Sequence, residues 1–104
     1  MSSTLTVDRD GLILTWSADA ERLLGYSAAD AVGQSIEIII PSRLRAPHKA
    51  GFRRFVQTGR SKLPEVVTTS ALHKSGAIVR LKISVRAVHG EHGDIVAVDA
   101  AMGY

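Results

Sequence analysis

Hydrophobic and polar residues alternate most regularly between residues 77 and 87. The apolar positions are Ala77, Val79, Leu81, Ile83, Val85 and Ala87, and the positions between them include Arg80, Lys82, Ser84 and Arg86. A period of two is typical of an antiparallel strand with one buried face. Shorter apolar segments at 65–72 and 94–102 are separated from it by turn sequences at 73–76 and 89–93. The pattern predicts three consecutive strands, with the odd-numbered face of the middle strand directed toward the core.

The beginning of the chain predicts a hairpin followed by a short helix. Residues 5–7 and 12–16 are rich in apolar and β-branched side chains and flank a turn sequence at 8–11. Ser17 is a suitable N-cap for a helix over 18–24, which the glycine at position 25 ends.

Two further short segments follow this helix. Ser27 can cap a second helix that stops at Gly33, and Asp30 stands three residues after the cap, as in a capping box. An apolar segment over 36–40 then ends at Pro41.

From Pro47 to Gly59 the apolar spacing becomes that of a helix. At about 100° per residue, one face holds His48, Phe52, Phe55 and Val56, and the polar residues Lys49, Arg53, Arg54 and Gln57 lie on the other side. Proline suits the first position of a helix, and glycine suits its end. The pattern therefore predicts that His48 lies on the buried face.

The order of these elements predicts an α+β fold. Two strands, three or four helices and three strands make one five-stranded antiparallel sheet with the helices packed on one face. A chain of 104 residues forms one core, so residues 1–104 are expected to be a single domain. Room for a small cavity remains between the helices and the odd-numbered face of the strand at 77–87.

Composition and charge narrow the possible chemistry. Hydrophobic residues make up 45% and charged residues 22% of the chain, which is typical of a globular protein. The absence of cysteine excludes disulfides, thiolate metal sites and cysteine nucleophiles. The net charge of +3 is small, and the basic residues are spread along the middle of the chain. We therefore expect no nucleic-acid partner.

The sequence contains no pattern typical of a membrane protein or of an enzyme. Its apolar runs are far shorter than the roughly 18 residues of a membrane-spanning helix, and the N-terminus lacks a secretion signal. We expect a cytoplasmic protein with no membrane partner. The motifs of P-loop, serine-hydrolase and zinc-protease sites are missing, and no two carboxylates share an apolar face. We therefore expect that the domain is not an enzyme.

Five short motifs resemble those of the PAS domain family. In chain order they are DRDGLI at 8–13, WSADAE at 16–21, LGYS at 24–27, VGQ at 32–34 and KSG at 74–76. The resemblance covers residues 4–99 without a large gap. It implies a PAS fold with strand order 2-1-5-4-3, which serves ligand sensing, dimerisation and signal relay.

A narrower resemblance concerns residues 40–48 and the helix that follows them. These residues are similar to the haem-binding PAS subgroup, which includes the rhizobial oxygen-sensing histidine kinases and the enterobacterial direct oxygen-sensing phosphodiesterase. In that subgroup a histidine seven residues after a proline ligates the iron, and Pro41 and His48 have this separation. The resemblance implies that His48 is the metal ligand and that Arg54 pairs with a haem propionate.

The resemblance extends to the strands that would cover the other side of the haem. It implies that Ile83 and Val85 crowd the gas ligand, and Val67 takes the place of an arginine that can hold bound oxygen. A haem needs one neutral imidazole, apolar walls and cations for its propionates. Phe52, four residues after His48, would add to the apolar wall.

The residues alone leave the cofactor open. Either His48 ligates b-type haem and the domain senses a diatomic gas, or His48 is a structural histidine and the domain is a cofactor-free dimerisation and relay domain. In a third alternative the pocket holds flavin or a small metabolite. Trp16 can stack on a flat cofactor or pack in the core. His89, Glu91 and His92 resemble a metal site in composition, but they lie in a hairpin turn.

The partner that we expect is a second copy of the chain. The apolar residues of 95–101, together with the outward Ile78 and Val88, offer a sheet face on which two subunits could pair. The sequence does not identify an effector domain or a partner protein.

Overall fold

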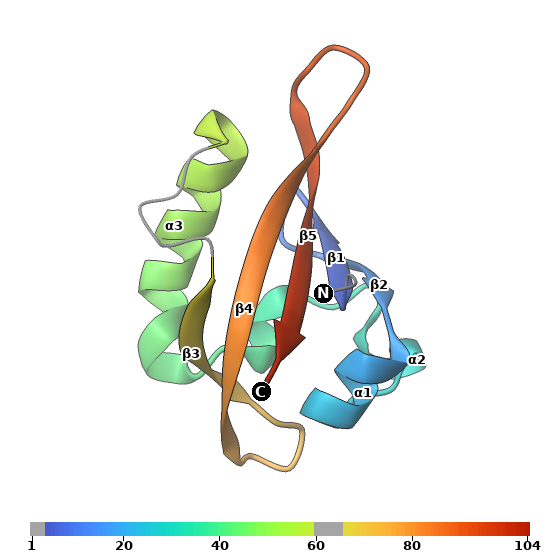
Figure 1. Ribbon diagram of the computed structural model, residues 1–104, viewed down its shortest axis with the longest axis vertical. Helices are drawn as coiled ribbons and strands as arrows, with labels where there is room; N and C mark the ends of the chain where they lie inside the picture. The colour runs from blue at the N-terminus through green and yellow to red at the C-terminus, as the bar shows by residue number, and fades with distance from the viewer. Residues whose placement is uncertain (1–3, 60–65) are drawn as a thin grey trace.

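A five-stranded antiparallel sheet forms the frame of the molecule (Figure 1). The computed structural model describes residues 4–59 and 66–104. The strands are β1 (Leu5–Asp8), β2 (Ile13–Trp16), β3 (Val67–Leu72), β4 (Ile78–His89) and β5 (Ile95–Gly103). Their order in the sheet is β2-β1-β5-β4-β3, which confirms the predicted fold and topology.

The first and last strands meet in the middle of the sheet. β1 pairs with β5, with Leu5 opposite Ala100 and Val7 opposite Val98. These four side chains are between 2% and 5% exposed. Since β5 also pairs with β4, the N-terminal hairpin is joined directly to the C-terminal meander.

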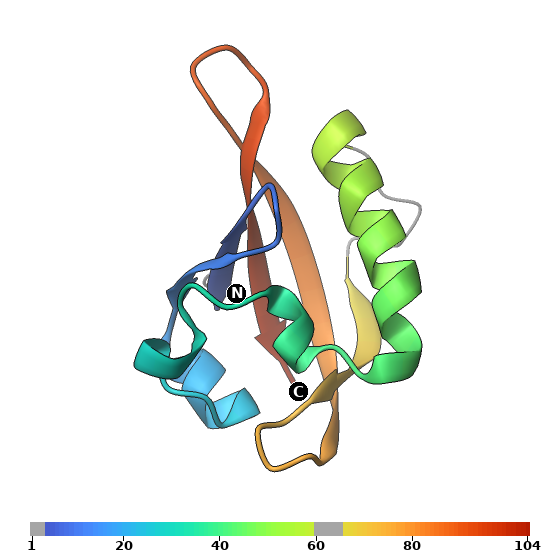
Figure 2. The same cartoon turned by 180° about the vertical axis from the view of Figure 1, so that it is seen from behind.

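The helices lie on one face of this sheet (Figure 2). They are α1 (Ala18–Leu24), α2 (Ala28–Ala31), the 3₁₀ helices η1 (Ile36–Ile39) and η2 (Ser42–Leu44), and α3 (Arg45–Thr58). Among these described helices, none has the length and apolar character needed to cross a membrane.

The first helices begin and end where capping residues satisfy their backbone groups. α1 has the predicted bounds, because the Ser17 side chain accepts a hydrogen bond from the Ala20 N–H and Gly25 takes a φ of 84° at the end. Ser27 caps α2 in the same way. α2 ends before the predicted Gly33, because the N–H of that glycine bonds to the carbonyl of Ile13 in β2.

α3 begins two residues earlier than the proline at position 47 predicts. The chain is already helical at Leu44, the last residue of η2, so α3 starts at Arg45 and Pro47 is its third residue. The first four N–H groups of a helix have no intrahelical acceptor, so a proline at the third position removes no hydrogen bond. The predicted end at Gly59 is confirmed, with a φ of 71°.

Trp16 belongs to the core. It is 7% exposed, its Nε1 donates a hydrogen bond to the carbonyl of Tyr26 at 2.8 Å, and its ring meets that of Tyr26 edge to face. This environment leaves the indole no open face for a cofactor.

The outer face of the sheet is more polar than the sequence predicts. Val98 and Ala100 of β5 are buried in the core, so the apolar residues of 95–101 do not form one outward face. At the outer side of the same strand, Asp99 accepts a hydrogen bond from Thr6 at 2.6 Å and one from Arg86 at 3.4 Å. Of the proposed dimer contacts, Ile78 is 53% exposed and Val88 is half-buried.

Candidate functional site

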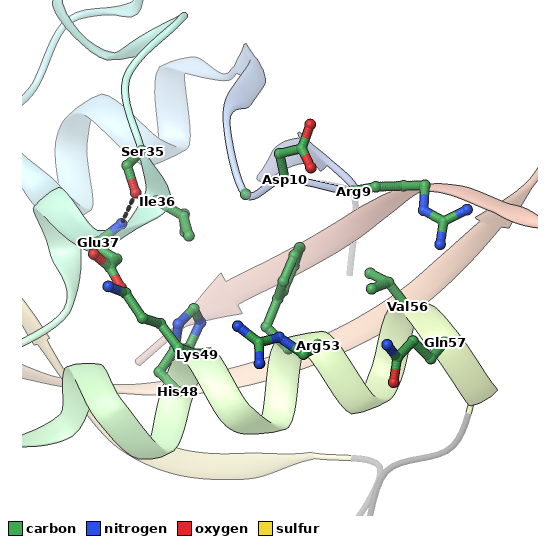
Figure 3. Close-up of a pocket in the computed structure, with 12 residues that line it drawn as sticks. Arg9, Asp10, Ser35, Ile36, Glu37, His48, Lys49, Arg53, Val56 and Gln57 are labelled. Carbon is green, nitrogen blue, oxygen red and sulfur yellow. Dashed lines mark hydrogen bonds and ion pairs between the residues drawn. The ribbon is translucent and has the colours of Figure 1, made fainter.

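A pocket of about 600 Å³ opens between α3, η1 and the turn that joins β1 to β2 (Figure 3). It is lined by Arg9, Asp10, Gly11, Ser35, Ile36, Glu37, His48, Lys49, Phe52, Arg53, Val56 and Gln57. The volume lies within the range of about 300–1,000 Å³ that is usual for small-molecule sites. The sequence predicts a cavity under the strand at 77–87, whereas this pocket lies at the β1–β2 end of the helical layer.

The β1–β2 turn lies over α3, and hydrogen bonds within the turn fix its shape. The Asp8 carboxylate accepts hydrogen bonds from the N–H groups of Asp10 and Leu12, each at 2.9 Å. Gly11 takes a φ of 84° at the tip, and a Cβ there would lie 3.7 Å from Ile36 and 3.9 Å from Phe52. The turn therefore approaches η1 and α3 closely enough to close one side of the pocket.

The apolar part of the lining comes mainly from α3. Val56 and Ile36 are each 8% exposed, and Phe52 is half-buried. The ring of Phe52 stacks on that of His48, with 6.1 Å between the ring centroids and 23° between the planes. The pocket thus has an apolar, aromatic wall along the helix.

His48 lies on the face of α3 that borders the pocket, as its helical phase predicts. Burial lowers the pKa of His48 below its ordinary value of 6.5, and the negative charge of Glu37 only partly opposes this effect. The imidazole is therefore neutral at neutral pH. A neutral imidazole has a nitrogen lone pair for a metal ion, which its charged form lacks.

A carboxylate stands beside this histidine. Glu37 Oε1 lies 3.5 Å from the Nζ of Lys49, and among the described residues it has no hydrogen-bond donor although the atom is buried. The Lys49 ammonium is thus an electrostatic partner of this oxygen that donates no hydrogen bond to it. The pocket therefore retains acceptor capacity next to its imidazole.

Two arginines reach the pocket from opposite sides. Arg53 projects from α3 and Arg9 from the β1–β2 turn. Arg54, which the haem-binding resemblance assigns to a propionate, is exposed and does not line this pocket. Sequence reasoning missed Arg9 because it is remote from α3 in the chain, and no local motif connects the two.

The structure divides the predicted site residues into two groups. His48 and Phe52 line the pocket, whereas Val67, Ile83 and Val85 lie in the sheet and do not. Val67 and Ile83 are direct partners across β3 and β4. Ile83 is half-buried, and Val85 is 44% exposed although it pairs with the buried Ala100.

The donor set around the pocket fits a haem better than a metal ion held by protein alone. Within residues 4–59 and 66–104, no three His, Asp or Glu side chains come together as ligands, and this includes the turn with His89, Glu91 and His92. A haem needs only one protein ligand, because its porphyrin supplies four nitrogens. His48, the aromatic wall and the cations together fit that group.

Sequence comparison with known proteins identifies the same fold family as the strand order does. The family model described as "PAS domain" matches residues 1–101. The sensor protein FixL of Bradyrhizobium diazoefficiens is 35% identical over 54 residues, which are 52% of this chain and 11% of FixL. The chain therefore matches only about a tenth of the length of that relative.

Solved structures resemble the whole fold. The PAS domain of a protein from Colwellia psychrerythraea superposes with a TM-score of 0.78 at 22% identity, covering 95% of this chain and 83% of that one. The PAS domain of the quorum-sensing receptor RpfR from Cronobacter turicensis, in complex with C12:0, has a TM-score of 0.73 at 17% identity, covering 95% and 89%.

Proposed function

The chain belongs to the PAS family of sensory domains in signal transduction, and on this premise we propose that it binds b-type haem through His48 and senses a diatomic gas. The observation that carries the proposal is a neutral histidine on the wall of a pocket of about 600 Å³, between an aromatic ring and a rim of cations. The match to the sensor protein FixL includes about half of this chain, and it supports the sensory part of the proposal.

Each group of pocket residues has a separate task in this proposal. His48 donates a ring nitrogen to the iron, and burial keeps that nitrogen unprotonated. Phe52, Val56 and Ile36 exclude water from the ligated face. When bound, the haem supplies an iron with a further coordination position for the gas.

The proposal also gives the sheet a role. Ile83 and Val85 do not line the pocket, so we propose that they respond to the gas through the sheet and not by contact with it. Val67, the partner of Ile83, offers no side-chain hydrogen-bond donor. A response in β4 passes to β5, its neighbour in the sheet, and from there to β1. We propose no catalytic activity for the domain.

The experiment is an absorption spectrum of the protein expressed with a supply of haem. We expect a Soret band that is distinct from that of free haem and that His48→Ala abolishes. His89→Ala is the matched control, because His89 is exposed at the end of β4 and should leave the band unchanged. A protein that is colourless, or that binds haem equally well without His48, contradicts the proposal.

A second candidate function is a cofactor-free dimerisation and relay domain. The observation that favours it is the exposure of Ile78, at 53%, on the outer side of the sheet, where it pairs with the half-buried Leu72 of β3. We expect such a domain to be a homodimer through this face. Analytical ultracentrifugation distinguishes it, since a monomer at tens of micromolar with no bound cofactor contradicts this alternative.

A further inference from the structure

The charged side chains of the pocket do not balance one another. Three of the lining residues are cationic (Arg9, Lys49 and Arg53), and two are anionic (Asp10 and Glu37). Lys49 is paired with Glu37 at 3.5 Å. Asp10 also lines the pocket, but its carboxylate points away from α3 in Figure 3.

Arg9 and Arg53 are left without a negative partner. Within residues 4–59 and 66–104, neither guanidinium forms an ion pair or a hydrogen bond. In Figure 3 the guanidinium of Arg9 turns toward α3 above Val56 and Gln57, while that of Arg53 lies along the helix. Two positive charges therefore border the same apolar hollow from two different elements.

The neighbourhood of these arginines strengthens their attraction for an anion. Val56 and Phe52 replace water with low-dielectric material on one side, and Coulomb attraction grows as the effective dielectric constant falls. A guanidinium also presents paired N–H donors that match the two oxygens of a carboxylate. An apolar ligand with carboxylates would thus satisfy the wall and both arginines together.

We propose that Arg9 and Arg53 form a two-sided clamp for the carboxylates of the pocket's occupant. The inference rests on the proposed function, in which the occupant is a haem with two propionates, and it moves the propionate contacts from Arg54 to this pair. The ligand class that the clamp selects is a flat apolar body with acidic groups at one edge.

The clamp also gives the ligand a mechanical effect. Arg9 follows β1 directly, and β1 pairs with β5 in the middle of the sheet. An occupant held by both arginines ties α3 to this hairpin, whereas an occupant held by α3 alone does not. A ligand shifts the relative position of α3 and the hairpin only if it binds more tightly to one of their two arrangements than to the other.

The test uses protoporphyrin IX and its dimethyl ester, because neither contains a metal and neither depends on ligation by His48. Binding of each is measured by porphyrin fluorescence with the full chain. We expect the diacid to bind about tenfold more tightly than the diester, as is usual for one charge-assisted hydrogen-bonded contact. Arg9→Gln and Arg53→Gln should each reduce this preference severalfold, and the preference should weaken with added salt.

Arg54→Gln is the matched control, since Arg54 neighbours Arg53 in α3 but lies outside the pocket lining. All three arginines are exposed, so the variants should fold, and circular dichroism checks this. Equal binding of the diacid and the diester, failure of both to bind, or a loss of preference in Arg54→Gln alone would overturn the clamp.

The haem spectrum distinguishes this failure from failure of the proposed function. A Soret band that depends on His48, combined with equal binding of the two porphyrins, would refute the clamp and leave haem binding intact. A clear preference for the diacid with no Soret band in any preparation would support the clamp and refute ligation through His48.

Discussion

The helix-covered face of the sheet has two halves that differ in how completely their apolar residues are covered. In the closed half, where β3 and the start of β4 meet α1 and η1, Leu24 is 0% and Leu81 is 1% exposed. In the open half, farther along β4, Val85 is 44% exposed. Leu81 and Val85 lie on the same face of one strand, four residues apart.

The alternation of apolar and polar residues along β4 predicts which side chains point toward the helices, but it does not predict how far each one is buried. The elements that cover each side chain determine its burial. The closed half is sealed by direct contacts, such as the hydrogen bond from the Lys74 N–H to the carbonyl of Leu24 at 2.9 Å. Away from the closed half, the helical layer leaves Val85 partly exposed and also contains the pocket lined by Arg9 and Arg53, which Val85 does not line. We infer that the closed half provides stability and that the open part of the helical layer provides the ligand site.

Truncation of one apolar side chain in each half should give the largest contrast. Leu81→Ala removes a fully buried side chain and leaves a cavity, so we expect a loss of about 2–5 kcal/mol in the free energy of unfolding. Val85→Ala removes a side chain that is already 44% exposed, and its cost should be within about 0.5 kcal/mol. Urea denaturation measures both, and equal losses would show that the two halves are equally packed.

Enlargement of a side chain tests the same contrast in the opposite direction. Ala20 in α1 is 0% exposed, so Ala20→Leu must displace its neighbours and should cost about 1–3 kcal/mol. Val85→Leu enlarges a side chain that is already 44% exposed and should be close to neutral. A large cost for Val85→Leu in thermal denaturation would mean that this part of the sheet is already filled.

The two glycines that end α1 and α3 allow a finer comparison. Gly25 and Gly59 have φ values of 84° and 71°, so alanine at either position carries a similar backbone cost of about 1–2 kcal/mol. A Cβ at Gly25 would lie 2.6 Å from the ring of His73, whereas a Cβ at Gly59 would be in ordinary contact with Ile95 at 3.5 Å.

The ring of His73 cannot move away without a cost. Its Nδ1 lies 3.0 Å from both the hydroxyl and the N–H of Ser75. We therefore expect Gly25→Ala to lose about 1 kcal/mol more stability than Gly59→Ala, as is usual for one disrupted hydrogen bond. Equal melting temperatures for the two variants would contradict the close packing assigned to the closed half.

The sequence predicts the closed half well because its signals are local. Ser17, Gly25 and Ser27 set helix ends through contacts within a few residues, and the structure places those ends within two residues of the prediction. The strand order is also predicted, because the five PAS motifs occur along the chain in the order that the resemblance requires. The end of α2 is slightly earlier than predicted, and the start of α3 is displaced by two residues, since a proline is tolerated anywhere in the first turn.

The candidate site is harder to predict because it joins distant segments. The helical phase of α3 is sufficient to turn His48 and Phe52 inward, and both line the pocket. The helical phase of α3 carries no information about the β1–β2 turn, so the sequence does not predict that Arg9 lines the pocket. The resemblance assigned a propionate contact to Arg54 by its position in the motif, whereas the neighbouring Arg53 reaches the pocket.

The smallest expected effect concerns the protonation of His48, which reports directly on how open the pocket is. Because burial lowers the pKa of His48, the folded protein binds fewer protons than the unfolded chain at pH values between that lowered pKa and about 6.5. The free energy of unfolding should therefore rise with pH through this window, and the contribution of His48 should be constant below the lowered pKa, where both states are protonated. His48→Gln should flatten that part of the profile, as urea denaturation at several pH values will show.

The neighbouring carboxylate supplies the control for this titration. Glu37 partly raises the pKa of His48, so Glu37→Gln should lower that pKa further and extend the window to lower pH. NMR titration of the His48 ring measures the change directly, with the exposed His89 as an internal reference. If His48 titrates at or above 6.5, its ring is in water, and the open half then lacks the neutral imidazole on which metal ligation depends.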